Sequence, residues 1–209
     1  MRRYLRSAVL VGWITFATVV ATRAADPIDG AVASAAAVAV ACALAARSGS
    51  KDDLALLNPA WSLAALLRGR LRITDLLPLW AAAAVGGLLL GMAGAAVVHR
   101  LPALSVTNRP DLLPAGVVLA VAGFVTAWLV TSASQSPALL VWAPALTTLV
   151  GAALLGGPFA AALNPAVLFG GGVAGIVDWT YAFVMTVVLL ATALIGALAS
   201  RYLDGRPIS

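Results

Sequence analysis

The tetrapeptide Leu57-Asn58-Pro59-Ala60 occurs a second time, without change, as Leu163-Asn164-Pro165-Ala166, and this pair decides the fold. Asparagine is among the best N-cap residues, because its side-chain carbonyl accepts a hydrogen bond from a free backbone N–H. Proline suits the next position, since it has no N–H to lose and its φ is already helical. Each copy therefore predicts a helix that begins directly after the asparagine.

The helix that follows each copy is too short to cross a membrane. From Asn58 to Arg68 is about ten residues, or roughly 16 Å of helix, whereas a hydrocarbon core is about 30 Å thick. A helix that starts at mid-membrane leaves N–H groups that lipid cannot satisfy but a water-filled cavity can. The two copies therefore predict half-helices at 59–67 and 165–176 that meet end to end beside a pore.

The composition is that of an integral membrane protein. The 209 residues are 62% hydrophobic and 10% charged, with a mean hydropathy of +1.02, whereas a soluble domain carries about 25% charged residues. The predicted fold class is all-α, with six transmembrane helices and two half-helices in a single domain over residues 1–209. The apolar runs place the six spans at 8–21, 28–46, 75–98, 112–132, 137–155 and 180–202. The first run could also be a secretory signal peptide, but its removal would leave five spans.

The spans form an internal repeat. The stretch Val11–Thr15 parallels Ala122–Thr126 at a separation of 111 residues, and the two asparagines are 106 residues apart. Because each half holds three spans, the second half, 112–203, is inserted upside down relative to the first, 8–98. The remaining tails are 1–7 and 204–209. Inverted repeats whose broken helices meet at the midplane are a known membrane design.

The basic residues agree with this topology. Thirteen Lys and Arg are present; with both termini in the cytoplasm, Arg23, Arg100 and Arg109 lie outside and the other ten lie inside. This is the positive-inside pattern of membrane proteins. We therefore predict a multi-pass protein of the plasma or inner membrane, with the lipid bilayer as its partner and both termini cytoplasmic.

Few residues offer any other chemistry. The single histidine, His99, has no neighbouring ligand, so we expect no metal site and no cofactor. The single cysteine, Cys42, lies in an apolar run and is interpreted as inert core. We find no nucleophile with an acid–base partner, and the charges lie between apolar runs, so we expect neither an enzyme nor a nucleic-acid partner. The tryptophans are interpreted as interface or packing residues: Trp13, Trp61, Trp80, Trp128, Trp142 and Trp179.

The two Asn-Pro-Ala copies in an inverted repeat resemble the aquaporin, or major intrinsic protein, family over about residues 10–203. The resemblance implies a passive channel for water or small neutral solutes, assembled as a homotetramer with one pore in each subunit. The half-helix N-termini would repel cations, and Asn58 and Asn164 would donate N–H groups to a passing oxygen. The backbone carbonyls before each tripeptide would accept hydrogen bonds along the path: Ala55, Leu56 and Leu57, and Ala161, Ala162 and Leu163.

The sequence departs from the family pattern at the outer constriction, or selectivity filter. Typical members carry Arg directly after the second Asn-Pro-Ala, where this chain has Val167. Counting back from the motifs places the other filter positions at Val38 or Ala33 in the second span, and at Ala152 or Ala153 in the fifth. The predicted filter of Val38, Ala152 and Val167 is small and apolar. Such a filter favours polyols, urea, ammonia or metalloid acids, although a hydrophobic constriction could also dewet.

The family's polar braces for the Asn-Pro-Ala loops are also replaced. A glutamate in the first and fourth spans corresponds here to Val11 and Ala122, and a third-span glutamine corresponds to Ala83. We expect Thr15 and Thr126 to take over part of the hydrogen bonding. Two alternatives to a channel stay open: a secondary transporter with broken helices, and a divergent non-conducting protein with a structural role.

Overall fold

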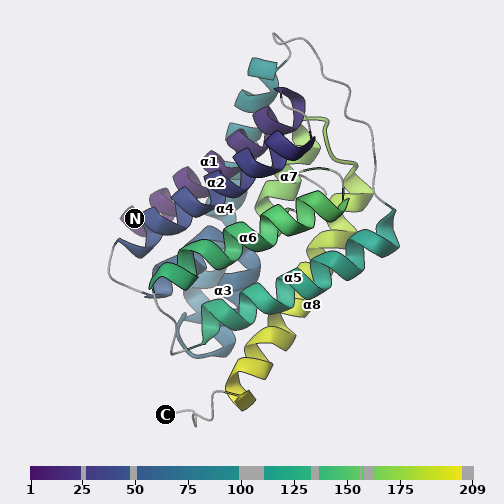
Figure 1. The fold of residues 1–209 in the computed structure, drawn as a ribbon. Helices are drawn as coiled ribbons and strands as arrows, with labels where there is room; N and C mark the ends of the chain where they lie inside the picture. Colours follow the sequence, from purple (N-terminus) through teal and green to yellow (C-terminus); the bar gives the residue numbers. More distant parts are fainter. Residues whose placement is uncertain are drawn as a thin grey trace.

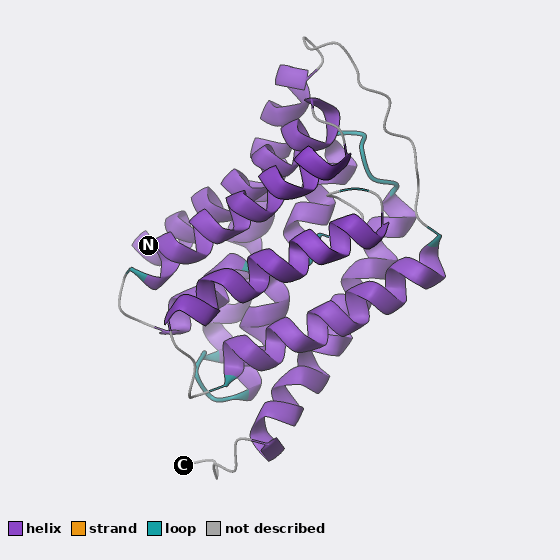
Figure 2. Cartoon of the chain, in the orientation of Figure 1, coloured by secondary structure: helices purple, strands orange, loops and turns teal. Residues whose placement is uncertain are grey.

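Every regular element in the part of the chain that the structure describes is helical (Figure 2). The structure is a computed structural model, and it describes residues 1–24, 27–47, 51–98, 111–132, 137–155, 157 and 162–203. Six long helices surround two short ones (Figure 1). The long helices are α1 (Arg2–Ala24), α2 (Pro27–Ala46), α4 (Ile73–Val98), α5 (Leu112–Thr131), α6 (Pro137–Leu155) and α8 (Trp179–Leu203).

The long helices agree with the predicted spans. By length and composition, α1, α2, α4, α5 and α8 can each cross a membrane. Helix α6 has 19 residues, about 28 Å by helical rise. Its apolar stretch, Val141–Leu155, is shorter than those of the other five. Helix α1 is longer than the run 8–21 predicted, and it packs along α4, α2 and α7 as an integral part of the bundle. The chain is therefore a multi-pass membrane protein.

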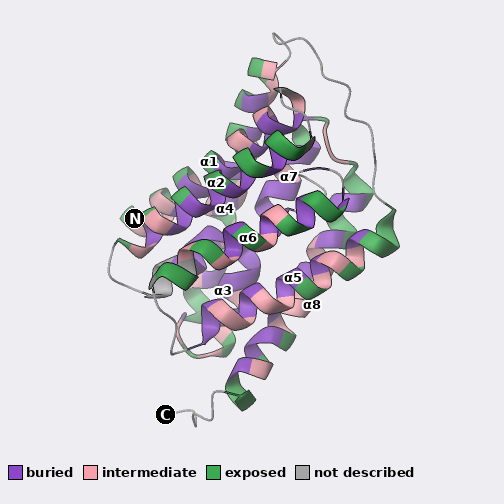
Figure 3. Cartoon of the chain, in the orientation of Figure 1, coloured by how far each residue is buried: buried purple, intermediate pink, exposed green. Residues whose placement is uncertain are grey.

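The two short helices, α3 (Pro59–Leu67) and α7 (Pro165–Val173), follow the two asparagines. Helix α3 has the predicted bounds and is preceded by a 3₁₀ helix, η1 (Lys51–Leu57). Helix α7 ends three residues before the predicted end at Ile176. Both are buried over most of their length, whereas the long helices expose apolar side chains outward (Figure 3).

Both short helices end in the same backbone motif. Gly69 and Gly175 have φ values of 69° and 68°, in the left-handed region where glycine carries no steric penalty. After α3, the Arg70 N–H donates to the Ala65 carbonyl over 2.9 Å; after α7, the Ile176 N–H donates to the Gly171 carbonyl over 3.0 Å. These are Schellman motifs, which pair otherwise free carbonyls at a helix end. The repeat thus covers both ends of each half-helix.

The first and last spans of each half run parallel to each other. Along α1 and α4, contacts join residues that are a nearly constant distance apart in sequence: Arg3 with Asp75, Ala8 with Gly86 and Val19 with Gly94. Along α5 and α8 the pairs are Gly116 with Met185, Gly123 with Thr192 and Thr131 with Ser200. Parallel neighbours require the chain to return between them, and the intervening long helix, α2 or α6, makes that return.

Contacts between the halves have the symmetry of an inverted repeat. Helix α3 of the first half packs on α5 and α8, and α7 of the second half packs on α1 and α4. Helices α2 and α6, which correspond to each other, pack together. Figure 1 shows α3 at the end of the bundle nearer the start of α1 and the end of α8, with α7 toward the opposite end. The half-helices therefore approach the middle of the bundle from opposite sides.

Candidate functional site

Asn58 and Asn164 start the two half-helices in the same way. Both have extended backbone angles, and each side-chain oxygen accepts a hydrogen bond from the N–H two residues later. The distances are 2.9 Å from the Ala60 N–H to Asn58 Oδ1 and 3.0 Å from the Ala166 N–H to Asn164 Oδ1. These caps satisfy a helix donor that would otherwise lack a partner in a buried setting.

The same two side chains connect the halves of the protein. Asn58 Nδ2 donates to the Leu163 carbonyl, and Asn164 Nδ2 donates to the Leu57 carbonyl, each over 2.6 Å. Each asparagine is thereby bonded to the residue that precedes the other asparagine. The N-termini of α3 and α7 meet at this point, as the sequence predicted. Because an amide nitrogen carries two hydrogens, each side chain keeps a second N–H.

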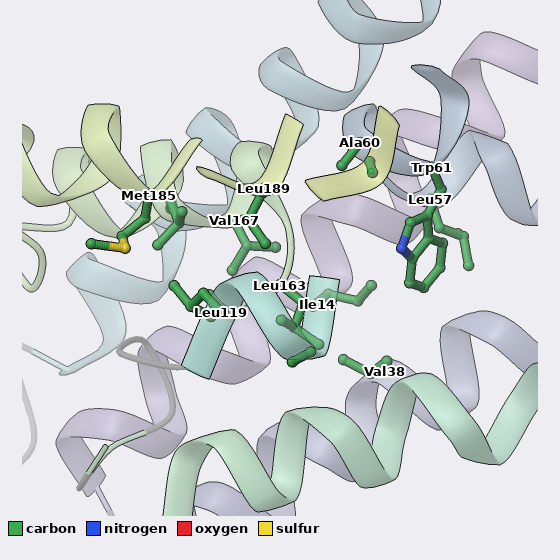
Figure 4. Close-up of a cluster of buried hydrophobic side chains, with 14 of the residues drawn as sticks. Ile14, Val38, Leu57, Ala60, Trp61, Leu119, Leu163, Val167, Met185 and Leu189 are labelled. Carbon is green, nitrogen blue, oxygen red and sulfur yellow. The ribbon is translucent and has the colours of Figure 1, made fainter. Parts of the chain in front are cut away.

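A cavity borders this junction and is lined from both halves. The space that water centres can occupy is about 30 Å³, roughly enough for two water molecules. Figure 4 shows several of the apolar lining residues, among them Ile14, Val38 and Trp61. The apolar lining comprises Ile14, Val38, Leu57, Trp61, Pro144, Ala162, Leu163 and Val167, and the remaining lining residues are Thr18, Ser34, Cys42, Asn58, Thr148 and Asn164.

Three hydroxyl groups in this lining were not found from the sequence. Thr18 Oγ1 donates to the Ile14 carbonyl over 2.7 Å, and Thr148 Oγ1 donates to the Pro144 carbonyl over 2.8 Å. The Thr18 and Ser34 hydroxyl oxygens lie 2.9 Å apart, so Ser34 is the donor to Thr18. Since all three protons point into the protein, the oxygens offer lone pairs. The sequence signal that could have revealed these hydroxyl groups is the four-residue spacing of lining residues along α1, α2 and α6.

The predicted filter residues differ in their placement. Val38 and Val167 both line the cavity. Ala152 is buried in the hydrophobic core, one turn beyond Thr148 on α6, and is not among the lining residues. The alternatives Ala33 and Ala153 are exposed on the outside of the bundle.

Three of the predicted carbonyl acceptors already have partners within the protein. Those of Leu57 and Leu163 accept from the two asparagines, and that of Leu56 accepts from Ser7 Oγ over 2.6 Å. Each oxygen retains a second lone pair. Ala162 lines the cavity, and Ala161 lies outside the described residues. Ala55 and Leu56 pack their side chains into a separate cluster that includes Leu71, Leu76 and Leu79.

Trp61 and Cys42, which were interpreted as packing residues, both line the cavity. Trp61 is 4% exposed and Cys42 is fully buried. Trp61 directly follows the first Asn-Pro-Ala, so it occupies the position in the first half that Val167 occupies in the second. For Trp61, the sequence signal that could have revealed its place in the lining is its position beside the motif. For Cys42, that signal is its four-residue spacing from Val38.

The positions of the missing family braces are apolar in the structure as well. Val11, Ala83 and Ala166 form a small buried cluster. The threonine hydroxyls donate within their own helices, Thr15 to the Val11 carbonyl over 2.9 Å and Thr126 to the Ala122 carbonyl over 2.8 Å. The expectation that they donate to the loops is therefore wrong. Ser7, one turn before Val11, provides a donor to η1 instead.

Close backbone contact holds α7 in place. A Cβ atom on Gly170 would lie 2.6 Å from the Gly87 carbonyl oxygen and 2.3 Å from Thr15 Cγ2. A Cβ atom on Gly91 would lie 2.6 Å from the Gly170 carbonyl oxygen. Small residues allow helices in lipid to approach this closely. Among the described residues, no three His, Cys, Asp or Glu side chains gather to hold a metal ion.

These features define an aquaporin-like membrane protein: long helices around two half-helices whose capped N-termini meet beside a cavity. A solved protein structure shares this fold. The X-ray structure of the aquaglyceroporin from Plasmodium falciparum matches with a TM-score of 0.68 over 94% of this chain and 91% of that chain. The two sequences are 15% identical, so the likeness concerns the fold. No protein-family model and no curated protein matches the sequence.

Proposed function

We propose that this protein is a passive transmembrane channel for water and small uncharged solutes. The observation that carries the proposal is the reciprocal pair of bonds from Asn58 to the Leu163 carbonyl and from Asn164 to the Leu57 carbonyl. These bonds hold two helix N-termini against each other beside a cavity. They also leave one N–H on each asparagine for a solute oxygen.

The electrostatics of this arrangement oppose ions. Each helix N-terminus carries the equivalent of roughly half a positive charge, and the two are adjacent at the cavity. A cation or a proton that enters loses its hydration and gains no negative partner, since no acidic side chain of the described residues lines the space. A neutral molecule loses less hydration free energy on entry. Its oxygen can accept hydrogen bonds from the asparagines, while its hydrogens contact the hydroxyl oxygens.

The filter we propose is apolar and lacks a fixed charge. Val167 takes the position where typical aquaporins have Arg, and Val38 faces the same cavity. Ala152 is the proposed third member, by sequence count. Without the guanidinium group the passage is wider and less polar. Polyols, urea, ammonia and metalloid acids are therefore the proposed solutes besides water.

The remaining assignments rest on charge and on resemblance. We place the protein in the plasma or inner membrane with both termini in the cytoplasm, because ten of the thirteen basic residues lie on one side in that topology. The homotetramer rests on resemblance to the aquaporin family. Residues 1–209 form one domain of two repeat halves, 8–98 and 112–203, in this proposal.

Stopped-flow measurements on proteoliposomes test the channel and its filter together. Vesicles with the protein should show faster water and glycerol equilibration than empty vesicles, without proton or cation leak. The variant Val167→Arg should reduce glycerol flux while water flux persists, because the added side chain narrows the passage and its charge is fixed. Equal glycerol flux in both proteins would remove the role given to Val167. A lack of any solute flux would favour the non-conducting alternative.

A further inference from the structure

We propose that Trp61 sets the solute preference of the cavity toward short linear polyols rather than water. Its indole N–H would bind a polyol oxygen, and its ring would pack on the carbon skeleton. This inference rests on the proposed channel function and goes beyond it. It assigns a binding role to the residue that directly follows the first Asn-Pro-Ala. The sequence had predicted a filter residue only after the second copy.

The internal repeat places Trp61 opposite a predicted filter residue. Trp61 and Val167 are 106 residues apart, the same separation as Asn58 and Asn164. Both directly follow an Asn-Pro-Ala copy, and both line the cavity. Because Trp61 is on α3 and Val167 is on α7, the two half-helices each contribute one side chain to the lining. The larger of the two is on α3.

The indole N–H of Trp61 is a free donor inside a buried site. No oxygen of the described residues accepts from it, in contrast to Trp80, whose Nε1 donates to Ser62 Oγ over 2.8 Å. The side chain is 96% buried, yet its nitrogen is not among the fully enclosed unpaired atoms of the described residues. The nitrogen therefore borders open space. Figure 4 shows it on the ring edge toward Ile14 and Leu163, which line the same cavity.

Acceptors and apolar groups complete the site. The oxygens of Thr18, Ser34 and Thr148 offer lone pairs, since their protons are donated within the protein. Ile14 and Val38 supply aliphatic surface to the same cavity. The cavity thus combines donors, acceptors and an apolar wall within a small volume.

A short polyol offers a partner to each of the three kinds of group as it passes. Its hydroxyls can accept from Trp61 and the asparagines and donate to the threonine and serine oxygens, while its C–H groups contact the ring and the aliphatic side chains. Water satisfies the polar groups but gains nothing from the apolar wall. A site with a few placed polar groups in a mostly apolar lining is typical of small-molecule recognition.

The variant Trp61→Phe tests the N–H with little change in shape. In proteoliposomes, the ratio of glycerol to water permeability should fall about fivefold, the effect of losing one hydrogen bond. Thr148→Val, which removes a lining hydroxyl contributed by α6, should lower the ratio in the same direction. Trp142→Phe is the matched control, because Trp142 is 59% exposed on the outer face of α6, and its ratio should stay at the wild-type value. Monodisperse elution and an unchanged helical circular dichroism spectrum establish that each variant is folded.

The outcomes separate this inference from the proposed function. If wild-type vesicles conduct glycerol and both Trp61→Phe and Thr148→Val keep the wild-type ratio, the role of Trp61 is overturned while the channel stands. If Trp61→Phe does not fold, the ratio in Thr148→Val decides the same point. If wild-type vesicles behave like empty ones for water and glycerol, the proposed function fails and the inference fails with it.

Discussion

Helices α3 and α7 have the same ends and different middles. Asn58 and Asn164 cap their starts with equal geometry, and Gly69 and Gly175 end them with nearly equal φ values. Between these ends the sequences differ, most clearly where α3 has Ala64, Ala65 and Leu66 and α7 has Gly170, Gly171 and Gly172. The comparison teaches that the ends are determined by backbone chemistry common to both, whereas the middles are determined by the different neighbours on each side.

The difference is clearest at one pair of positions. Ala64 in α3 corresponds to Gly170 in α7, 106 residues later. Helix α7 packs on the backbone of Gly87 and Gly91 in α4, which leaves no room for a methyl group. Helix α3 instead packs through side chains, and the Ser62 hydroxyl accepts from Trp80 on α4. One half-helix is fixed by close backbone approach and the other by a side-chain bond.

Exchanging the residues of this pair should give the largest effect. Gly170→Ala places a methyl group against the Gly87 carbonyl and Thr15, and we expect a loss of about 3 kcal/mol or more in the free energy of unfolding. Ala64→Gly should cost only about 1–2 kcal/mol, from helix propensity and a lost buried methyl group. Unfolding in mixed detergent micelles measures both.

Gly116→Ala is the control for this exchange, because the nearest atom to its new methyl group would be Met185 Cε at 4.0 Å. It should leave the free energy of unfolding unchanged or slightly raised. A Gly170→Ala protein as stable as Gly116→Ala would show that α7 can move away from α4, and the contrast between the two half-helices would then be lost.

Replacing the asparagines should give an intermediate and equal effect in both halves. Asn58→Ala and Asn164→Ala each remove a helix cap and a bond to the opposite half, together worth roughly 2 kcal/mol. The same unfolding experiment should therefore return similar losses for both variants. A loss of stability in only one of the two variants would show that the two caps, although alike in geometry, contribute unequally to the free energy of unfolding.

The smallest effect is expected at the helix ends. Gly69→Ala and Gly175→Ala put a side chain at positive φ, which costs about 1–2 kcal/mol, and no atom within 4 Å would add a clash at either site. Gly69→Asn and Gly175→Asn should lose less, because asparagine tolerates this conformation better. Thermal unfolding midpoints of the four proteins test the order. An alanine variant that matches wild type would contradict the strain assigned here.

The half-helix ends could be predicted from sequence because Asn, Pro and Gly act directly on their own backbone. Asn58, Pro59 and Gly69 gave the bounds of α3 correctly. The end of α7 was placed too late, because four glycines, Gly170, Gly171, Gly172 and Gly175, all qualify as stop residues. In the structure the left-handed stop is Gly175, with a φ of 68°. Propensity alone does not distinguish a glycine needed for close approach from one needed for positive φ.

The cavity lining was harder to predict for a physical reason. In a soluble helix, the polar face marks the outside, but lipid is as apolar as the protein interior. Val38 lines the cavity and Val40, two residues later, is 47% exposed, although the residues are identical. The inward face of α2 was therefore visible only through Ser34. The same lack of contrast concealed the placement of Trp61 and Thr148.

The two amide-to-carbonyl bonds at the centre make each half of the chain dependent on the other for completion. During synthesis the first half emerges well before the second, so Asn58 waits for an acceptor that lies 105 residues downstream. Until then the start of α3 lacks its anchor. The two reciprocal bonds therefore form late, once both halves are present. A defect in the second repeat should appear as disorder in the first.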